Sequence, residues 1–112
     1  MPTPRETADL QLVKYNARDL DGFCALFAET ARLVDLPSQT VLAQGLGEIR
    51  AFYATRFANE NLSCRVHAHC DIANFAIDRE TIEGVPGAPI DVVAIYEVQD
   101  GLITQVHFIR SS

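Results

Sequence analysis

The chain has 112 residues and a formal net charge of −6, and these two properties exclude several classes of protein. The length predicts a single domain over residues 1–112. Nucleic acid is not an expected partner, because phosphate binding needs clustered Lys and Arg, whereas the nine basic residues here are scattered. No run approaches the ~18 consecutive apolar residues of a membrane helix, and no secretory signal is visible. We therefore expect a soluble, cytoplasmic protein with no membrane partner.

The three cysteines, Cys24, Cys64 and Cys70, do not pair off evenly and show no CxxC spacing. Each one has an apolar or strand-like context. We expect buried thiols in a reducing compartment, and neither a disulfide framework nor a zinc site.

Helical patterns dominate the first half of the chain. Thr3 can cap a first helix that runs to about residue 17, with Glu6 completing a capping box and with Leu10 and Val13 on its apolar stripe. Apolar residues spaced three and four apart predict two further helices, over 20–27 and 48–59. Between them, alternating apolar residues predict a pair of strands, over 31–36 and 40–44.

From residue 62 onward the apolar period changes from 3.6 to 2, which indicates strands. The expected strands cover residues 62–73, 75–83, 90–99 and 102–110. Asp100-Gly101 between two apolar runs is typical of a short hairpin. Helices first and a strand meander afterwards predict an α+β domain with helices on one face of a curved antiparallel sheet.

Asp35 is the sharpest candidate for chemistry in the first half of the chain. It alternates with Leu33 on an expected strand, so if Leu33 points into the core, the carboxylate of Asp35 points the same way. The alternative is that Asp35 lies at the mouth of the strand, hydrated or paired with an arginine.

The last strand offers a second candidate, His107. It shares a face with Gln105 and Ile109, while Val106 and Phe108 share the other face, and the period alone leaves open which face is inward. With the His107 face inward, Gln105 and His107 would be polar anchors in an apolar pocket, as in many small-molecule sites. Otherwise His107 bonds a carbonyl group or lies at a dimer surface.

His67 and His69 also share a strand face and could chelate a metal ion. No third ligand is implied, and two histidines on a charged face are more often a hydrated or subunit-facing surface, so no metal is expected. Nucleophilic catalysis has little support, because the chain has no GxSxG motif and Cys24 lies on the packed face of a helix.

Three segments resemble a known family: YNARDLDGFCALFAETARLVDLP at 15–37, GLGEIRAFY at 45–53 and YEVQDGLITQVHFI at 96–109. Together with the element order, they resemble the nuclear transport factor 2-like superfamily, in particular its ketosteroid isomerase and SnoaL-like branch. The resemblance implies a cystatin-like, cone-shaped, curved antiparallel sheet wrapped around three N-terminal helices, with a pocket between helices and sheet. It does not settle the activity, because this fold carries isomerases, cyclases, dehydratases and pure binding modules.

Carried over by this resemblance, Asp35 falls where ketosteroid isomerases have their general base, and His107 becomes its partner in the pocket. The further residues that the resemblance places at the pocket are Gln11, Tyr15, Phe52, Ala94, Tyr96, Gln105 and Ile109. The isomerase builds its oxyanion hole from a tyrosine and a protonated aspartate, as in the standard worked case. Gln11 and Ala94 stand at those two positions here, so efficient steroid isomerisation is not expected.

The expected function is therefore a cofactor-independent proton-transfer enzyme of the isomerase, cyclase or dehydratase (lyase) type, acting on a small apolar carbonyl or hydroxyl compound. Asp35 would be the base and His107 its partner or the acid. The alternative is a non-catalytic module that binds a small hydrophobic ligand or dimerises. A homodimer through the outer sheet face is expected, because Val93 and Ile95 are apolar on the face opposite Ala94 and Tyr96, so that both faces must be covered. Coverage of this face by a loop or tail is the alternative.

Overall fold

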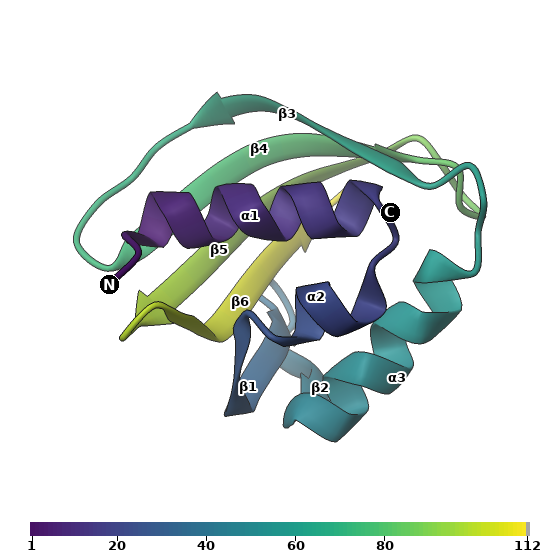
Figure 1. Ribbon diagram of the computed structural model, residues 1–112. Coiled ribbons are helices and arrows are strands. Elements are labelled where there is room, and N and C mark those ends of the chain that lie inside the picture. The colour runs from purple at the N-terminus through teal and green to yellow at the C-terminus, as the bar shows by residue number, and fades with distance from the viewer. Residues whose placement is uncertain (112) are drawn as a thin grey trace.

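The computed structural model describes residues 1–111 and shows three helices and six strands (Figure 1). The helices are α1 (Pro4–Asn16), α2 (Leu20–Cys24) and α3 (Leu46–Phe57). The strands are β1 (Phe27–Asp35), β2 (Thr40–Gln44), β3 (Ser63–His69), β4 (Phe75–Glu83), β5 (Ile90–Gln99) and β6 (Leu102–Arg110). None of the helices described is long and apolar enough to cross a membrane.

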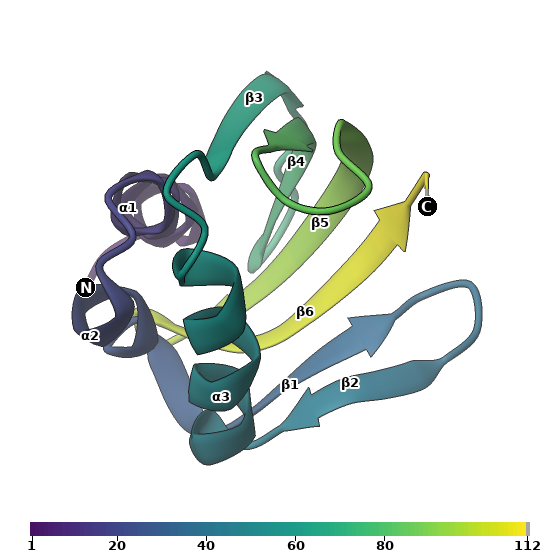
Figure 2. The same ribbon diagram turned by 90° about the vertical axis from the view of Figure 1, so that its right-hand side faces the viewer.

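The strands form one curved, open sheet in the order β2-β1-β6-β5-β4-β3, with all three helices on its concave side (Figures 1 and 2). Helix α1 packs against β3, β4 and β5, while α3 packs against β1 and β2. The α+β cone with helices on one face is therefore confirmed. One detail differs from the expected antiparallel sheet, because β1 and β6 pair in parallel.

Helix α1 begins as predicted, with a full capping box between Thr3 and Glu6. Its buried face differs from the predicted stripe, because Leu10 and Val13 are exposed. The face turned toward the sheet carries Thr7, Ala8, Gln11 and Tyr15. Two of these residues are polar, so a pattern of apolar residues alone points to the wrong side of this helix.

Helix α2 ends three residues earlier than predicted, at Cys24, and β1 begins at Phe27. The carbonyl oxygen of Leu26 accepts a 2.8 Å hydrogen bond from the backbone N–H of Ile103, so the chain joins β6 immediately after the helix. Behind this junction lies an aromatic core in which Phe23 contacts the rings of Tyr15, Phe27, Tyr53 and Phe57. This cluster holds the three helices against the β1 end of the cone.

The cysteines only partly match the expectation. Cys24 and Cys64 are buried free thiols, whereas Cys70 is exposed, because β3 ends at His69 instead of continuing to residue 73. The chain turns there, and Ala73 has a positive φ of 53°.

Candidate functional site

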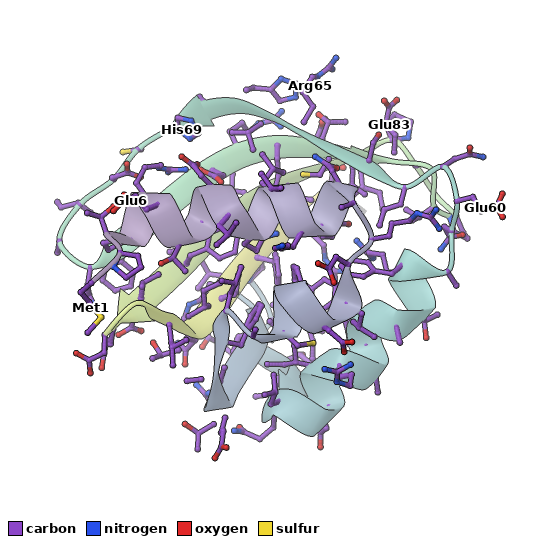
Figure 3. The ribbon with its side chains drawn as sticks, viewed as in Figure 1. Met1, Glu6, Glu60, Arg65, His69 and Glu83 are labelled. Atoms are coloured by element: carbon purple, nitrogen blue, oxygen red, sulfur yellow. The ribbon has the colours of Figure 1, made fainter. Side chains whose placement is uncertain are left out.

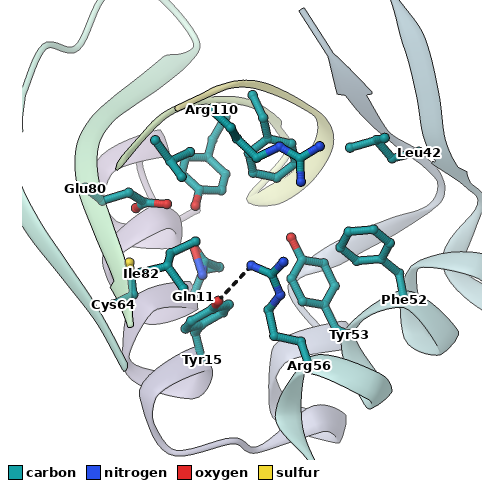
Figure 4. Close-up of a pocket in the computed structure, with 13 residues that line it drawn as sticks. Gln11, Tyr15, Leu42, Phe52, Tyr53, Arg56, Cys64, Glu80, Ile82 and Arg110 are labelled. Carbon is teal, nitrogen blue, oxygen red and sulfur yellow. Dashed lines mark hydrogen bonds between the residues drawn. The ribbon is translucent and has the colours of Figure 1, made fainter. Parts of the chain in front are cut away.

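Among the described residues, a well-defined pocket lies on the inner face of the cone, between the sheet, α1 and α3 (Figure 4). Its enclosed volume is only about 30 Å³, room for one or two waters, and the space between its walls including the open mouth is about 460 Å³. A ligand must therefore displace side chains at the mouth. The lining residues are Gln11, Tyr15, Leu42, Phe52, Tyr53, Arg56, Cys64, Glu80, Ile82, Val92, Tyr96, Phe108 and Arg110.

Glu80 supplies the carboxyl group of this pocket. Its position follows from β4, where Ala76, Asp78, Glu80 and Ile82 alternate onto the buried face. The side chain is only 5% exposed. Burial raises the pKa of Glu80 to about 7, the nearby Cys64 thiol opposes this rise, and the negative charge of Asp78 adds to it. Near neutral pH this carboxyl group can both take up and release a proton.

Three tyrosines supply neutral hydroxyl groups to the same pocket. Burial raises the pKa of Tyr15 to about 12, although Arg56, which donates a 3.4 Å hydrogen bond from Nη1 to its Oη, opposes the rise. Burial also raises the pKa values of Tyr53 and Tyr96. All three hydroxyls therefore keep their protons at neutral pH and can donate hydrogen bonds to a ligand.

Four of the residues expected at the pocket line it: Gln11, Tyr15, Phe52 and Tyr96. Ala94 lies on the same inner face of β5, between Val92 and Tyr96, and is fully buried without lining the pocket itself. Its register partner on β4 is Asp78. The structure therefore has a pocket between helices and sheet, and the predicted residues Gln11 and Tyr15 of α1 and Phe52 of α3 line it.

Gln105, His107 and Ile109 lie on the outer face of the sheet, so the prediction that they face the pocket is wrong. Val106 and Phe108 occupy the inner face instead, and the pairing of β6 shifts register between Ile103 and Gln105. This irregularity places Ile103 and Val106, three residues apart, both at 0% exposure. A strict period of two cannot reveal it.

The outer face has its own polar contacts. Arg32 donates from Nη2 to the Oε1 of Gln105 at 3.0 Å, and Gln105 Nε2 lies 3.1 Å from His107 Nε2. His107 is therefore part of a surface row of side chains, away from the pocket.

Asp35 lies at the end of β1, where its register partner is Phe108, while Val34 pairs with His107. Asp35 and His107 are therefore on opposite faces, and the predicted acid–base pair is not formed. The Oγ and the backbone N–H of Ser38 donate to Oδ2 of Asp35 at 2.6 and 3.1 Å, which holds the pKa of this carboxyl below its ordinary value. Asp35 lines a shallow groove at the mouth of the cone.

The lining residues with polar or ionisable groups that sequence reasoning missed are Glu80, Tyr53, Cys64, Arg56 and Arg110; it also missed the apolar walls Leu42, Ile82, Val92 and Phe108. A signal for Glu80 exists in the sequence, because Asp78 and Glu80 alternate with Ala76 and Ile82 on one strand face. The opposite face carries Ile77 and Arg79, so the pattern does not say which of the two is buried.

The two histidines considered as metal ligands lie apart from the pocket. His67 Nε2 is 2.7 Å from the Oγ1 of Thr81, and His69 Nδ1 is 3.0 Å from Oδ1 of Asp78. Within residues 1–111, no three His, Cys, Asp or Glu side chains are grouped as metal ligands would be.

Comparison with known proteins identifies the family. The model of the SnoaL-like domain matches residues 12–106. A search of curated proteins finds no match.

Solved structures share the fold along nearly the whole chain. A cystatin-fold protein from Novosphingobium aromaticivorans is 24% identical, with a TM-score of 0.88 over 98% of this chain and 100% of that one. A proposed polyketide cyclase from Sinorhizobium meliloti is 17% identical (TM-score 0.81; 97% and 95% covered). A proposed ketosteroid isomerase from Kribbella flavida is 20% identical (TM-score 0.82; 97% and 78% covered). At these identities the likeness establishes the fold alone.

Proposed function

We propose that this protein, which belongs to the SnoaL-like domain family, is a cofactor-independent proton-transfer enzyme of the isomerase, cyclase or dehydratase type. Its substrate would be a small carbonyl or hydroxyl compound with an apolar body. The observation that carries this proposal is the buried carboxyl group of Glu80, whose pKa of about 7 suits a group that accepts and returns protons. In this proposal Glu80 takes the role that the sequence had suggested for Asp35 and His107.

The chemistry needs only groups that are present in the pocket. The carboxylate of Glu80 removes a proton from the carbon next to the substrate carbonyl, and the electron pair of that C–H bond forms the enolate. A tyrosine hydroxyl, from Tyr15 or Tyr53, donates a hydrogen bond to the enolate oxygen. Protonated Glu80 then returns the proton to a second carbon, or assists the departure of a hydroxyl group as water.

The arrangement of the walls supports this assignment. Figure 4 shows Glu80 on one side of the pocket and Tyr53 and Arg56 on the other, so a small molecule between them would contact an acid–base group and hydrogen-bond donors at once. Arg56 also donates to the Tyr15 hydroxyl, which makes that hydroxyl a better donor.

The test is proton exchange in deuterated buffer. We expect the protein to speed the exchange of α-protons in a panel of small β,γ-unsaturated ketones and 3-hydroxy carbonyl compounds, followed by proton NMR. Glu80→Gln should lower the rate by ~10²–10⁴. The matched control is Glu83→Gln, an exposed glutamate on the same strand that points away from the molecule (Figure 3). Equal rates for wild type and Glu80→Gln would contradict the proposal.

The second candidate function is a binding module without catalysis. The observation that favours it is the small enclosed volume of about 30 Å³, which leaves little room for a substrate unless Phe52 or Arg56 moves. Ligand binding with no proton exchange in any compound would support this alternative.

We also propose that a second copy of the chain covers the outer face of the sheet. Val93 and Ile95 are half-buried there beside the row formed by Arg32, Gln105 and His107, and Ile109 is 40% exposed. Sedimentation equilibrium would show a dimer that Ile95→Glu converts to a monomer. A monomer at all concentrations in the wild type would contradict this proposal.

A further inference from the structure

Two arginines, Arg56 and Arg110, line the pocket from different elements. Arg56 comes from the last turn of α3, and Arg110 is the last residue of β6. Figure 4 shows both guanidinium groups on the same side of the pocket, next to Tyr53 and across from Glu80. The chain has 15 acidic and nine basic residues, so two cations in one small pocket stand out against its overall charge.

Neither arginine forms an ion pair within residues 1–111. Arg18, Arg32 and Arg65 share this property, but none of those three lines the pocket. The hydrogen bond of Arg56 goes to the neutral Tyr15 hydroxyl at a long 3.4 Å. Nε of Arg110 is buried and has no hydrogen-bond partner among the described residues. A buried N–H group without an acceptor is unfavourable, and a ligand with acceptor oxygens would satisfy it.

Two carboxyl groups in this part of the molecule, those of Asp35 and Glu80, do not serve as counter-ions. Asp35 is close enough to feel the charge of Arg110, but its Oδ2 accepts two hydrogen bonds from Ser38. Glu80 belongs to the same pocket, yet its pKa is raised, the opposite of what a guanidinium ion in contact would cause. The pocket thus keeps two positive charges available for something that is not part of the chain.

We propose that Arg56 and Arg110 bind the carboxylate of a small organic acid, and that this acid is the substrate class of the site. That this acid is a substrate rests on the proposed function. That a carboxylate binds here rests on the two arginines alone. Guanidinium groups suit this ligand, because each presents two parallel N–H donors to a carboxylate. The apolar part of the acid would lie against Leu42, Phe52 and Phe108, with its reacting carbon toward Glu80.

The experiment compares acids with their neutral amides. Acetate, butyrate and benzoate are titrated against the labelled protein, alongside acetamide, butyramide and benzamide, with binding followed by backbone-amide NMR. We expect the acids, and not the amides, to shift resonances around Arg56 and Arg110. Arg56→Gln and Arg110→Gln should each weaken acid binding by ~10- to 100-fold.

Two further variants test whether the effect is specific to the two pocket arginines. Arg65→Gln is the matched control, since Arg65 is exposed on β3 and points away from the molecule (Figure 3). It should leave binding unchanged. Asp35→Asn removes a negative charge near Arg110 and should strengthen acid binding. If Arg110→Gln does not fold, Arg56→Gln and the comparison of acids with amides in the wild type decide the matter.

The outcomes separate this inference from the proposed function. Acid binding that needs the arginines, without proton exchange, would support the carboxylate site and contradict the enzyme. Exchange in neutral ketones, together with acid binding that is insensitive to both arginine substitutions, would support the enzyme and overturn the carboxylate site. Equal affinity for acids and amides, or no binding of any acid at tens of millimolar, would also overturn it.

Discussion

Glu80→Gln should stabilise the folded protein at pH 8, and this prediction follows directly from the burial of the carboxyl group. The ordinary pKa of a glutamate, 4.5, applies to the unfolded chain, whereas in the folded protein the pKa is about 7. Below pH 4.5 both states hold the proton. Between the two values the unfolded chain releases it and the folded protein retains it, so the free energy of unfolding falls as the pH rises.

The size of this effect follows from the difference of about 2.5 pH units between the two pKa values. At 1.36 kcal/mol for each unit, ionisation of Glu80 costs the folded state roughly 3 kcal/mol once the pH exceeds 7. Glutamine has nearly the same shape and no charge to bury. The variant should therefore match the wild type near pH 4.5 and gain up to ~3 kcal/mol in unfolding free energy at pH 8.

The assay is urea unfolding followed by circular dichroism at several pH values between 4.5 and 8. At each pH we compare the free energies of unfolding of wild type and variant. Their difference isolates Glu80, because the titration of all other groups contributes equally to both proteins. Glu83→Gln changes an exposed position on the same strand, and its difference in unfolding free energy from the wild type should not change with pH. A flat difference for Glu80→Gln as well would refute the reasoning, since Glu80 would then titrate alike in both states.

Two further predictions concern single contacts that hold the cone together. Gly84→Ala should destabilise the fold by at least ~1–3 kcal/mol, since Gly84 has a φ of +83° and an added Cβ would lie 1.9 Å from the Asn61 carbonyl oxygen. The control is Gly87→Ala, with a φ of +85° but nothing within 4 Å; equal thermal melting of the two variants would contradict the steric argument. Arg5→Met should cost ~3 kcal/mol, because Asp78, only 2% exposed, loses the guanidinium group that donates to it at 2.8 Å. Arg50→Met, whose partner Asp21 is exposed, should change urea unfolding little, and the same small change for Arg5→Met would show that Asp78 does not need its cation.

Much of the fold could be predicted from the sequence because local signals and packing agree. Four strands were predicted with the bounds that the structure gives: 40–44, 75–83, 90–99 and 102–110. Each is set between turn residues such as Asp100-Gly101, where both residues have positive φ. The helix ends are predicted less accurately. Helix α2 stops early because the carbonyl group of Leu26 accepts a hydrogen bond from the backbone of Ile103, 77 positions further along the sequence.

The candidate site was harder to predict, for two physical reasons. Helix α1 buries Thr7 and Gln11 in place of Leu10 and Val13, so the polar residues that reach the pocket look like surface residues in the sequence. In β6, the register shift after Ile103 exchanges the faces of the residues that follow. His107 therefore lies on the outer face of the sheet and not in the pocket, although the strand that carries it was predicted correctly.

The two buried carboxylates of β4 show why Glu80, and not Asp78, marks the site. They are two residues apart, and both are at most 5% exposed. Asp78 accepts from the Arg5 guanidinium at 2.8 Å and lies 3.0 Å from His69, so its negative charge is compensated as structural carboxylates are. Glu80 forms no ion pair among the described residues; the nearby Cys64 thiol lowers its pKa only in part, and the neighbouring Asp78 raises it further. A chain that compensates one buried carboxylate and leaves the next uncompensated keeps a destabilising group at a single place, which is the behaviour expected of a functional residue.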